Sequence, residues 1–273
     1  MINELSIKVK ELEVSYLHKP GVNKPRVCTI FIHGFPFNKE TWKGQLQSLP
    51  EEVEGIAYDI RGFGGSAGGH TFFSIDLFSK DLFNLIDTLK LENVVLCGLS
   101  MGGYIALRAA ELNLGKIAGL IVADTNASAD SDAGKLKRFE SIELIQTGGK
   151  AEFAEGFLKN VFTEQAINSK AKGVDSIREA ILSTSNSTLC SAQLALASRT
   201  STLDFLPQID FPVLVVRGES DKLMTQQQAE DFLSQIPQAE FAEIPQAAHL
   251  PNLENPDTFN HHLNTFLTKH FLS

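Results

Sequence analysis

Residues 94–103 read Val94-Val95-Leu96-Cys97-Gly98-Leu99-Ser100-Met101-Gly102-Gly103, and they are the most informative stretch of the chain. The first four are apolar and mostly compact, which is typical of a buried strand. The pattern Gly-x-Ser-x-Gly follows, and the next segment, YIALRAAEL, is helical in composition. Glycines permit a cramped turn between a strand and a helix, and such a turn projects a serine hydroxyl from the sheet. The stretch therefore predicts a strand, a sharp turn presenting Ser100, and a helix.

Strand-like and helix-like segments alternate on both sides of this turn. Apolar or alternating runs predict strands at 11–17, 27–32, 53–58, 117–123, 211–216 and 240–244. Amphipathic spacing predicts helices at 39–49, 74–89 and 226–235, and a last helix with Asn255 as its N-cap and Pro256 as its first residue. This alternation predicts an α/β fold, in which helices cover both faces of a parallel sheet.

The sequence changes character between Asn126 and Asp204. Long apolar runs disappear, and apolar residues occur at helical spacing among charged and small ones, as in Phe153, Phe157 and Val161. This pattern predicts a helical insertion. We therefore expect a core domain in two parts, 1–125 and 205–273, with a helical cap or lid at 126–204.

Composition excludes several classes of function. The 273 residues are 43% hydrophobic and 21% charged, which is enough apolar material for a large buried core. The formal net charge of −9 argues against binding to nucleic acid or to a membrane surface, because both require a basic face. We therefore expect a globular protein whose partner is a small molecule, and the sequence leaves its oligomeric state open.

The N-terminal sequence and the spacing of the cysteines bear on the protein's location and on metal binding. The first twenty residues alternate apolar and polar side chains, without the uninterrupted apolar run of a signal peptide or anchor. The cysteines Cys28, Cys97 and Cys190 are odd in number, far apart and without CxxC spacing. We expect a cytoplasmic protein with no metal site and no organic cofactor.

An activated serine needs a histidine as general base. Of the seven histidines, His18, His261, His262 and His270 are expected at the surface, His70 lies in a glycine-rich loop, and His33 is expected to shape the loop after a strand. His249 remains, in a loop between the last predicted strand and the last helix. Loops at the carboxyl ends of parallel strands are where such sheets place their sites, so His249 is the predicted base.

Two aspartates compete to orient this histidine, because each directly follows a predicted strand. Asp221 comes before the last strand and helix, which sets it beside His249, whereas Asp124 comes immediately before the insertion. Both give the chain order Ser, Asp, His. We favour Asp221 over Asp124, and Glu219 is a lesser competitor.

Five motifs in this order, HGFP, DxRGxGxS, GLSMGG, GESD and AAHLPNLENP, resemble the α/β-hydrolase fold superfamily over essentially the whole chain. The resemblance implies a mostly parallel eight-stranded sheet with a helical cap inserted after the sixth strand. It also implies Ser100 as nucleophile, His249 as base, Asp221 as acid, and an oxyanion hole formed by the backbone N–H groups of Phe35 and Met101.

Within the superfamily, the sequence is most similar to the group of 3-oxoadipate enol-lactonases and aryl esterases. HGFP also occurs in haloalkane dehalogenases and epoxide hydrolases, but those enzymes carry aspartate where this chain has Ser100. This difference speaks against both chemistries. The basic residues Lys135, Lys137 and Arg138 of the insertion are expected either to attract a carboxylate-bearing substrate or to form a solvated helix face.

The leading hypothesis is a serine hydrolase that cleaves a small carboxylic ester or lactone through an acyl-enzyme intermediate. Hydrolysis of a carbon-carbon bond and cofactor-free perhydrolysis or haloperoxidase chemistry are the alternatives among enzymes, because they use the same triad. A non-catalytic ligand receptor on the same fold is the alternative from another class, since a fold does not fix a function.

Overall fold

The computed structural model describes residues 1–22, 25–70 and 72–272. Its strands form one eight-stranded sheet in the order β1-β2-β4-β3-β5-β6-β7-β8. Their bounds are β1 Asn3–Val9, β2 Leu12–Lys19, β3 Val27–Ile32, β4 Val53–Tyr58, β5 Val94–Leu99, β6 Ile117–Ala123, β7 Val213–Gly218 and β8 Glu240–Ile244. The central strands β3, β5 and β7 are buried along their whole length, which explains their continuous apolar sequence.

The sheet is mostly parallel. Strands β1 and β2 form an antiparallel hairpin, and β2 also pairs antiparallel with β4. All remaining neighbours, from β4 through β3 and β5 to β8, pair parallel. The predicted α/β-hydrolase fold is therefore confirmed, and the N-terminal hairpin is its antiparallel part.

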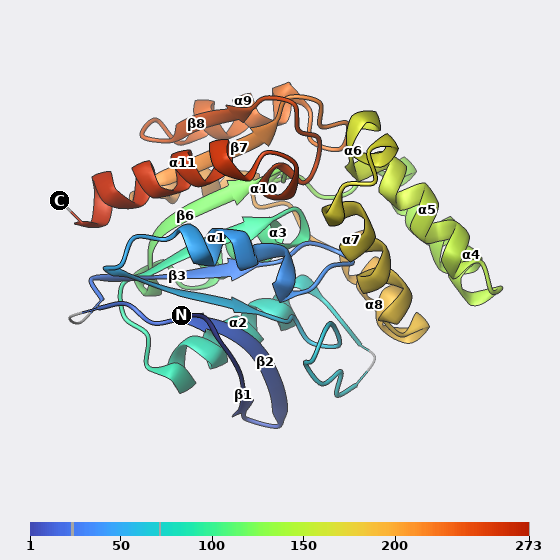
Figure 1. The fold of residues 1–273 in the computed structure, drawn as a ribbon, viewed down its shortest axis with the longest axis horizontal. Helices are drawn as coiled ribbons and strands as arrows, with labels where there is room; N and C mark the ends of the chain where they lie inside the picture. Colours follow the sequence, from blue (N-terminus) through green and yellow to red (C-terminus); the bar gives the residue numbers. More distant parts are fainter. Residues whose placement is uncertain (23–24, 71, 273) are drawn as a thin grey trace.

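Core helices cover both faces of the sheet (Figure 1). Helices α1 and α11 contact each other, and α2 contacts α3, which packs against β3, β5 and β6. The helical elements of the core are η1 Lys39–Trp42, α1 Lys43–Ser48, α2 Ile75–Leu89, α3 Met101–Leu112, η2 Leu114–Lys116, η3 Leu203–Gln208, α9 Gln226–Gln235, α10 Pro251–Glu254, α11 Pro256–Leu267 and the π-helical turn η4 Thr268–Leu272.

Side-chain caps define several helix starts. Ser74 accepts a hydrogen bond from the N–H of Leu77 at the start of α2, and Asn255 accepts one from Thr258 at the start of α11. The prediction of Asn255 as N-cap is confirmed. Trp42 is buried and packs against Phe31 and Phe259, with ring centroids 5.1 and 5.9 Å away, so it belongs to the core.

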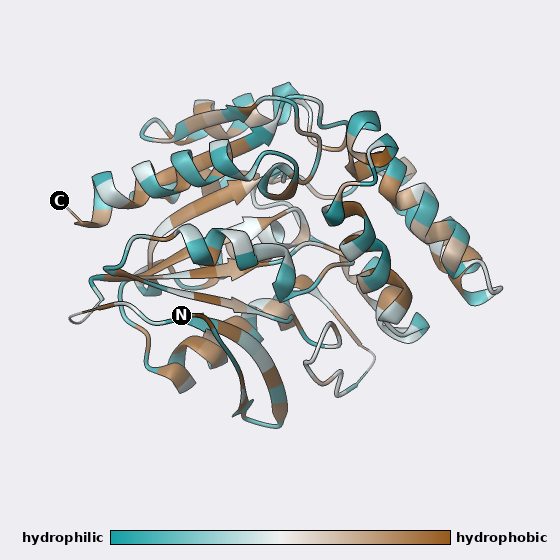
Figure 2. Ribbon diagram, viewed as in Figure 1, coloured by the Kyte–Doolittle hydropathy of each residue, from teal (hydrophilic) through white to brown (hydrophobic). Residues whose placement is uncertain are grey.

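The helical insertion follows β6 and forms a layer beyond the carboxyl ends of the parallel strands (Figure 1). Its helices are α4 Asp132–Gln146, α5 Lys150–Val161, α6 Glu164–Asn168, α7 Lys172–Ser183 and α8 Asn186–Ala197. Helix α4 packs on α8, and α5 packs on α7. Hydrophobic and hydrophilic residues alternate along α4 and α5, whereas strands such as β6 are almost uniformly hydrophobic (Figure 2). Within the described residues, no helix is long and apolar enough to cross a bilayer.

Some predicted boundaries were wrong. The helix predicted at 39–49 is divided into η1 and α1, and the helix after the serine begins at Met101, three residues earlier than the segment YIALRAAEL indicated. Strand β7 runs from Val213 to Gly218, two residues later than predicted at each end. Pro212 marks its start because proline has no N–H for a sheet ladder.

The turn between β5 and α3 has no room for larger residues. Ser100 has φ 53° and ψ −114°, a conformation that L-residues rarely adopt. A Cβ on Gly98 would lie 2.3 Å from the carbonyl oxygen of Gly102, and a Cβ on Gly102 would lie 2.0 Å from that of Ile32. Glycine is therefore required at both positions by close backbone contacts, and these contacts hold Ser100 at the edge of the sheet.

Gly102→Ala is expected to lower the free energy of unfolding by about 1–3 kcal/mol, because the new methyl group meets backbone that cannot move aside. Gly156→Ala is the matched control: nothing lies within 4 Å of an added Cβ in the middle of α5. It should raise stability by about 0.5–1 kcal/mol. Urea unfolding of the two variants measures both effects, and equal stability of the two would contradict the packing at the turn.

Candidate active site

Ser100, His249 and Asp221 come together at the carboxyl end of the sheet. Ser100 lies between β5 and α3, Asp221 follows β7, and His249 lies in the loop between β8 and α10. The Nε2 atom of His249 is 2.9 Å from Ser100 Oγ, and its Nδ1 atom is 2.9 Å from Asp221 Oδ2. The structure thus brings together the three side chains predicted from the sequence.

The hydrogen bonds determine which nitrogen of His249 carries the proton. Asp221 is buried, and its Oδ1 atom accepts a hydrogen bond from the N–H of Leu223 at 2.8 Å. An ionised carboxylate only accepts, so Nδ1 of His249 donates to Asp221 and Nε2 carries a free lone pair. The hydroxyl of Ser100 then donates to Nε2, which is the arrangement in which an imidazole can remove a proton.

Asp221 is built to stay ionised. Burial alone raises the pKa of a carboxyl group. For Asp221, the pairing with His249 and the hydrogen bond from the N–H of Leu223 outweigh burial, and its pKa lies below the ordinary value. A charged Asp221 fixes the orientation of the imidazole and stabilises it when it becomes an imidazolium.

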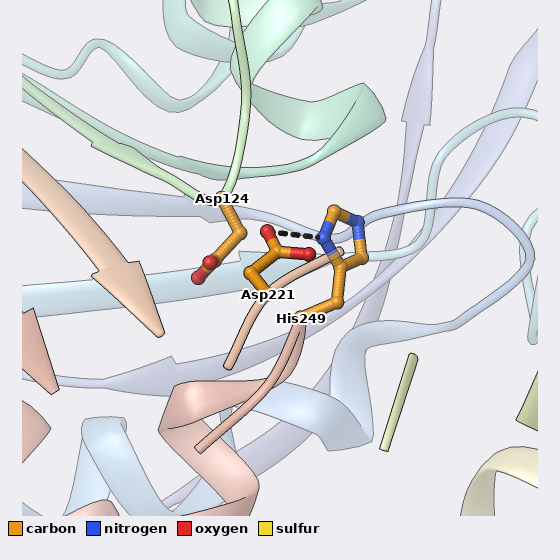
Figure 3. Close-up of side chains that lie close together, drawn as sticks. All are labelled: Asp124, Asp221 and His249. Atoms are coloured by element: carbon orange, nitrogen blue, oxygen red, sulfur yellow. Dashed lines mark hydrogen bonds and ion pairs between the residues drawn. The ribbon is translucent and has the colours of Figure 1, made fainter. Parts of the chain in front are cut away.

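Asp124 lies behind this pair, at the end of β6. Its Oδ1 atom accepts a hydrogen bond from the N–H of Gly218 at 2.8 Å. Figure 3 shows Asp221 between Asp124 and His249, with the hydrogen bond from the imidazole to Asp221. The three side chains are of types that bind metals. However, Nδ1 of His249 carries the proton that it donates to Asp221, and the lone pair of Nε2 accepts the hydrogen bond from Ser100, so both ring nitrogens already have partners.

Phe35 and Met101, whose backbone N–H groups are the predicted oxyanion hole, lie beside the same space. Met101 is the first residue of α3, so its N–H has no acceptor within the helix. Phe35 follows β3, and both residues line the cavity that contains Ser100. The oxyanion hole itself stays a prediction.

His33 shapes the loop that carries Phe35. Its ring lies within 2.8 Å of the carbonyl oxygen of Gly34 through Nδ1, and its Nε2 atom accepts a hydrogen bond from the N–H of Ile60 at 3.0 Å. Burial lowers the pKa of His33 to about 4, with smaller opposing effects from neighbours including Asp59. A neutral His33 therefore donates through Nδ1 and accepts through Nε2, and it holds two loops together as a structural residue.

Glu254 connects the His249 loop to the insertion. One of its carboxylate oxygens accepts hydrogen bonds from the N–H and hydroxyl of Thr163, and the other accepts one from the N–H of Ala248. The N–H of His249 itself donates to the carbonyl oxygen of Val161 at the end of α5. Sequence reasoning missed Glu254, although it lies within the quoted segment AAHLPNLENP.

A cavity of about 800 Å³ lies above Ser100 and His249. Residues of the insertion line it together with residues of the core, and its apolar lining residues include Phe35, Met101, Leu144, Phe153, Phe157 and Leu223. The rings of Phe35, Phe153 and Phe157 pack against one another with centroids 5.9–6.3 Å apart. The volume falls within the usual range for small-molecule sites.

Other lining residues of the cavity are polar, and several of them are charged. Asp130 pairs with both Arg138 and Arg199, and the guanidinium of Arg199 lies 4.0 Å from the ring centroid of Tyr104. Lys137 and Arg138 line this cavity. Lys135 pairs with Asp132 and borders a separate surface hollow. Two of the three basic residues singled out in the sequence therefore face the site.

Comparison with known proteins agrees with this geometry. Residues 29–262 match the model of a family described as the Alpha/beta hydrolase family. The chain is 27% identical over 244 residues to 3-oxoadipate enol-lactonase 2 of Acinetobacter baylyi, which covers 86% of each protein. A stretch of 75 residues, 27% of each chain, is 40% identical to a non-heme chloroperoxidase of Kitasatospora aureofaciens.

A solved structure agrees over nearly the full length. It is a thermophilic esterase from Thermogutta terrifontis with malate bound, which superposes with a TM-score of 0.91 at 30% identity. The match covers 98% of this chain and 99% of the esterase.

Proposed function

The chain belongs to the alpha/beta hydrolase family, and we propose that it is a serine hydrolase that cleaves small carboxylic esters or lactones through an acyl-enzyme intermediate. The observation that carries the proposal is the continuous chain of hydrogen bonds from Ser100 through His249 to Asp221, each 2.9 Å long. A serine hydroxyl becomes a good nucleophile when an adjacent base removes its proton. The likeness to an enol-lactonase and to an esterase supports the same class of substrate.

In the first half of the proposed reaction, Ser100 Oγ attacks the carbonyl carbon and its proton passes to His249 Nε2. The negative charge on the carbonyl oxygen is stabilised by the N–H groups of Phe35 and Met101. One such donor contributes about 3–4 kcal/mol to the transition state. The tetrahedral intermediate then collapses, the bond to the alkoxy oxygen breaks, and the imidazolium gives its proton to that leaving group.

In the second half, a water molecule replaces the alcohol. His249 removes a proton from the water as its oxygen attacks the acyl carbon, and the proton is then transferred to Ser100 Oγ as the acyl bond breaks. The acid is released and the serine is restored. With a lactone the leaving alkoxy group stays attached to the acyl chain, so the same steps give a single hydroxy acid. With an enol lactone the released enol tautomerises, and the product is a keto acid.

A fluorophosphonate probe should form one covalent adduct with the wild-type protein, seen by intact mass, because the probe reacts with activated serines and requires no knowledge of the substrate. Ser100→Ala and His249→Ala should both abolish the adduct. Asp221→Asn should slow its formation far more than Asp124→Asn does.

A folded wild-type protein that forms no adduct and leaves small aryl esters intact would contradict the proposal. That result would favour the receptor hypothesis, in which the same cavity binds a ligand without chemistry. An adduct that survives in Ser100→Ala would place the reactive group elsewhere.

The cavity supports a substrate with an apolar part and an anionic part. The packed rings of Phe35, Phe153 and Phe157 would contact the apolar part, and Lys137 and Arg138 line the same cavity and would attract the anionic part. The insertion, residues 126–204, would then act as a lid that shapes the substrate site. The cytoplasmic location expected from the sequence stays a prediction.

Lys137→Met should lower kcat/KM for an ester that carries a carboxylate by about two- to fivefold at low salt, because one exposed charge attracts another only weakly. A neutral ester of the same size should be unaffected. Lys135→Met is the matched control, since Lys135 lies on the same helix and outside the cavity. Equal losses with the charged and the neutral ester would contradict a role for Lys137 in charge recognition.

Perhydrolysis is the second candidate, because a stretch of the chain resembles a non-heme chloroperoxidase. Hydrogen peroxide would then replace water in the second half of the reaction and release a peracid. Analysis of the products of ester cleavage with and without peroxide separates the two functions.

A further inference from the structure

Asp124 is a buried carboxyl group that the proposed reaction does not use. Its side chain follows β6 and is 1% exposed. The N–H of Gly218 satisfies Oδ1, but Oδ2 is buried and receives no hydrogen bond from any described residue. A buried carboxylate oxygen without a donor is unfavourable, because it has lost its water and gained nothing in return.

The neighbours of Asp124 make ionisation still less favourable. One carboxylate oxygen of Asp124, one of Asp221 and one ring nitrogen of His249 all lie within 4.8 Å of one another. Asp221 is the more readily ionised of the two carboxyl groups, because its two oxygens accept hydrogen bonds from His249 and from the N–H of Leu223. Two like charges at this separation in a buried site disfavour each other, so one carboxyl group keeps its proton.

Among charged groups, Asp221, His249 and Arg217 affect Asp124 in the part of the chain that the structure describes. The guanidinium of Arg217 is engaged elsewhere, with the carbonyl oxygens of Met224 and Asp221 and with the carboxylate of Glu243. Burial, followed by the charge of Asp221, raises the pKa of Asp124 well above its ordinary value. The N–H of Gly218 and Arg217 oppose this shift without reversing it.

We propose that Asp124 is a neutral carboxylic acid whose Oδ2 hydroxyl donates a hydrogen bond to Asp221, so that Asp124 positions the carboxylate that orients His249. The proposal rests on the proposed serine hydrolase function. Protonation converts the unpartnered oxygen into a donor and satisfies it. It also gives Asp221 a third hydrogen bond, which fixes its carboxylate plane at the angle that meets Nδ1 of His249. Asp124 is thus a positioning residue that does not touch the substrate.

Infrared spectroscopy tests the protonation directly, whatever the protein's activity. The difference spectrum of wild type minus Asp124→Asn at neutral pH should contain the carbonyl band of one protonated carboxyl group, which shifts in heavy water. A difference spectrum with only ionised-carboxylate bands would overturn the proposal. Because this measurement needs no turnover, it remains decisive if the hydrolase function fails.

Activity tests the positioning role. Asparagine has the shape of a protonated aspartate: its oxygen can accept from Gly218 and its N–H₂ group can donate to Asp221. Asp124→Asn should therefore keep kcat within about threefold of wild type, whereas Asp124→Leu, which has no donor, should lower kcat about tenfold or more with little change in KM. Circular dichroism shows whether the leucine variant folds. If it does not fold, Asp124→Ala is a smaller replacement without a donor, and it should also lower kcat.

The pH profile separates positioning from a merely structural role. At alkaline pH wild-type Asp124 ionises, loses its donor and repels Asp221, so activity should fall. Asparagine cannot ionise, so the activity of Asp124→Asn should persist to higher pH. Identical alkaline limbs would overturn the proposal. A loss of activity in Asp124→Asn as large as that in Asp221→Asn would also overturn the proposal, because it would show that Asp124 acts as an ionised carboxylate.

Discussion

The backbone contact between Gly102 and Ile32 is the constraint on which the site depends. It brings the first turn of α3 against the end of β3, so closely that a single methyl group would not fit. The turn that precedes α3 is hydrogen-bonded to the end of β6 and the residues after it. The N–H of Ser100 donates to the carbonyl oxygen of Ala123, and the hydroxyl of Thr125 donates to the carbonyl oxygen of Ser100. Ser100 is therefore held in an unfavourable backbone conformation by three neighbouring strands at once.

The parallel sheet brings the other side chains of the site to Ser100. Adjacent strands β5, β6, β7 and β8 end at the same edge, and the residues that follow them are Ser100, Asp124, Asp221 and His249. The His249 loop is then tied to the insertion through Glu254 and Val161. The loop that carries His249 and the insertion are consequently joined directly by hydrogen bonds.

Sequence was sufficient where a residue type and its neighbours specify a local geometry. Gly98, Ser100 and Gly102 predict the turn, and the order of strands predicts that Asp221 and His249 reach its edge. The rest depends on distant contacts. Glu254 reads as an ordinary surface residue until the fold places it beside Thr163. The protonated state proposed for Asp124 arises only from its burial beside Asp221. The pairing of Asp130 with Arg138 and Arg199 also depends on the fold, because the spacing of apolar residues in the sequence carries no information about it.

The central claim is that Ser100 becomes covalently acylated during turnover. Rapid acid quenching during the cleavage of p-nitrophenyl acetate, followed by peptide mass analysis, tests it most directly. We expect an acetyl group on Ser100 that forms within the initial burst of nitrophenol and is absent from His249→Ala. Steady release of nitrophenol by the wild type with Ser100 unmodified throughout, or unchanged release by Ser100→Ala, would contradict it.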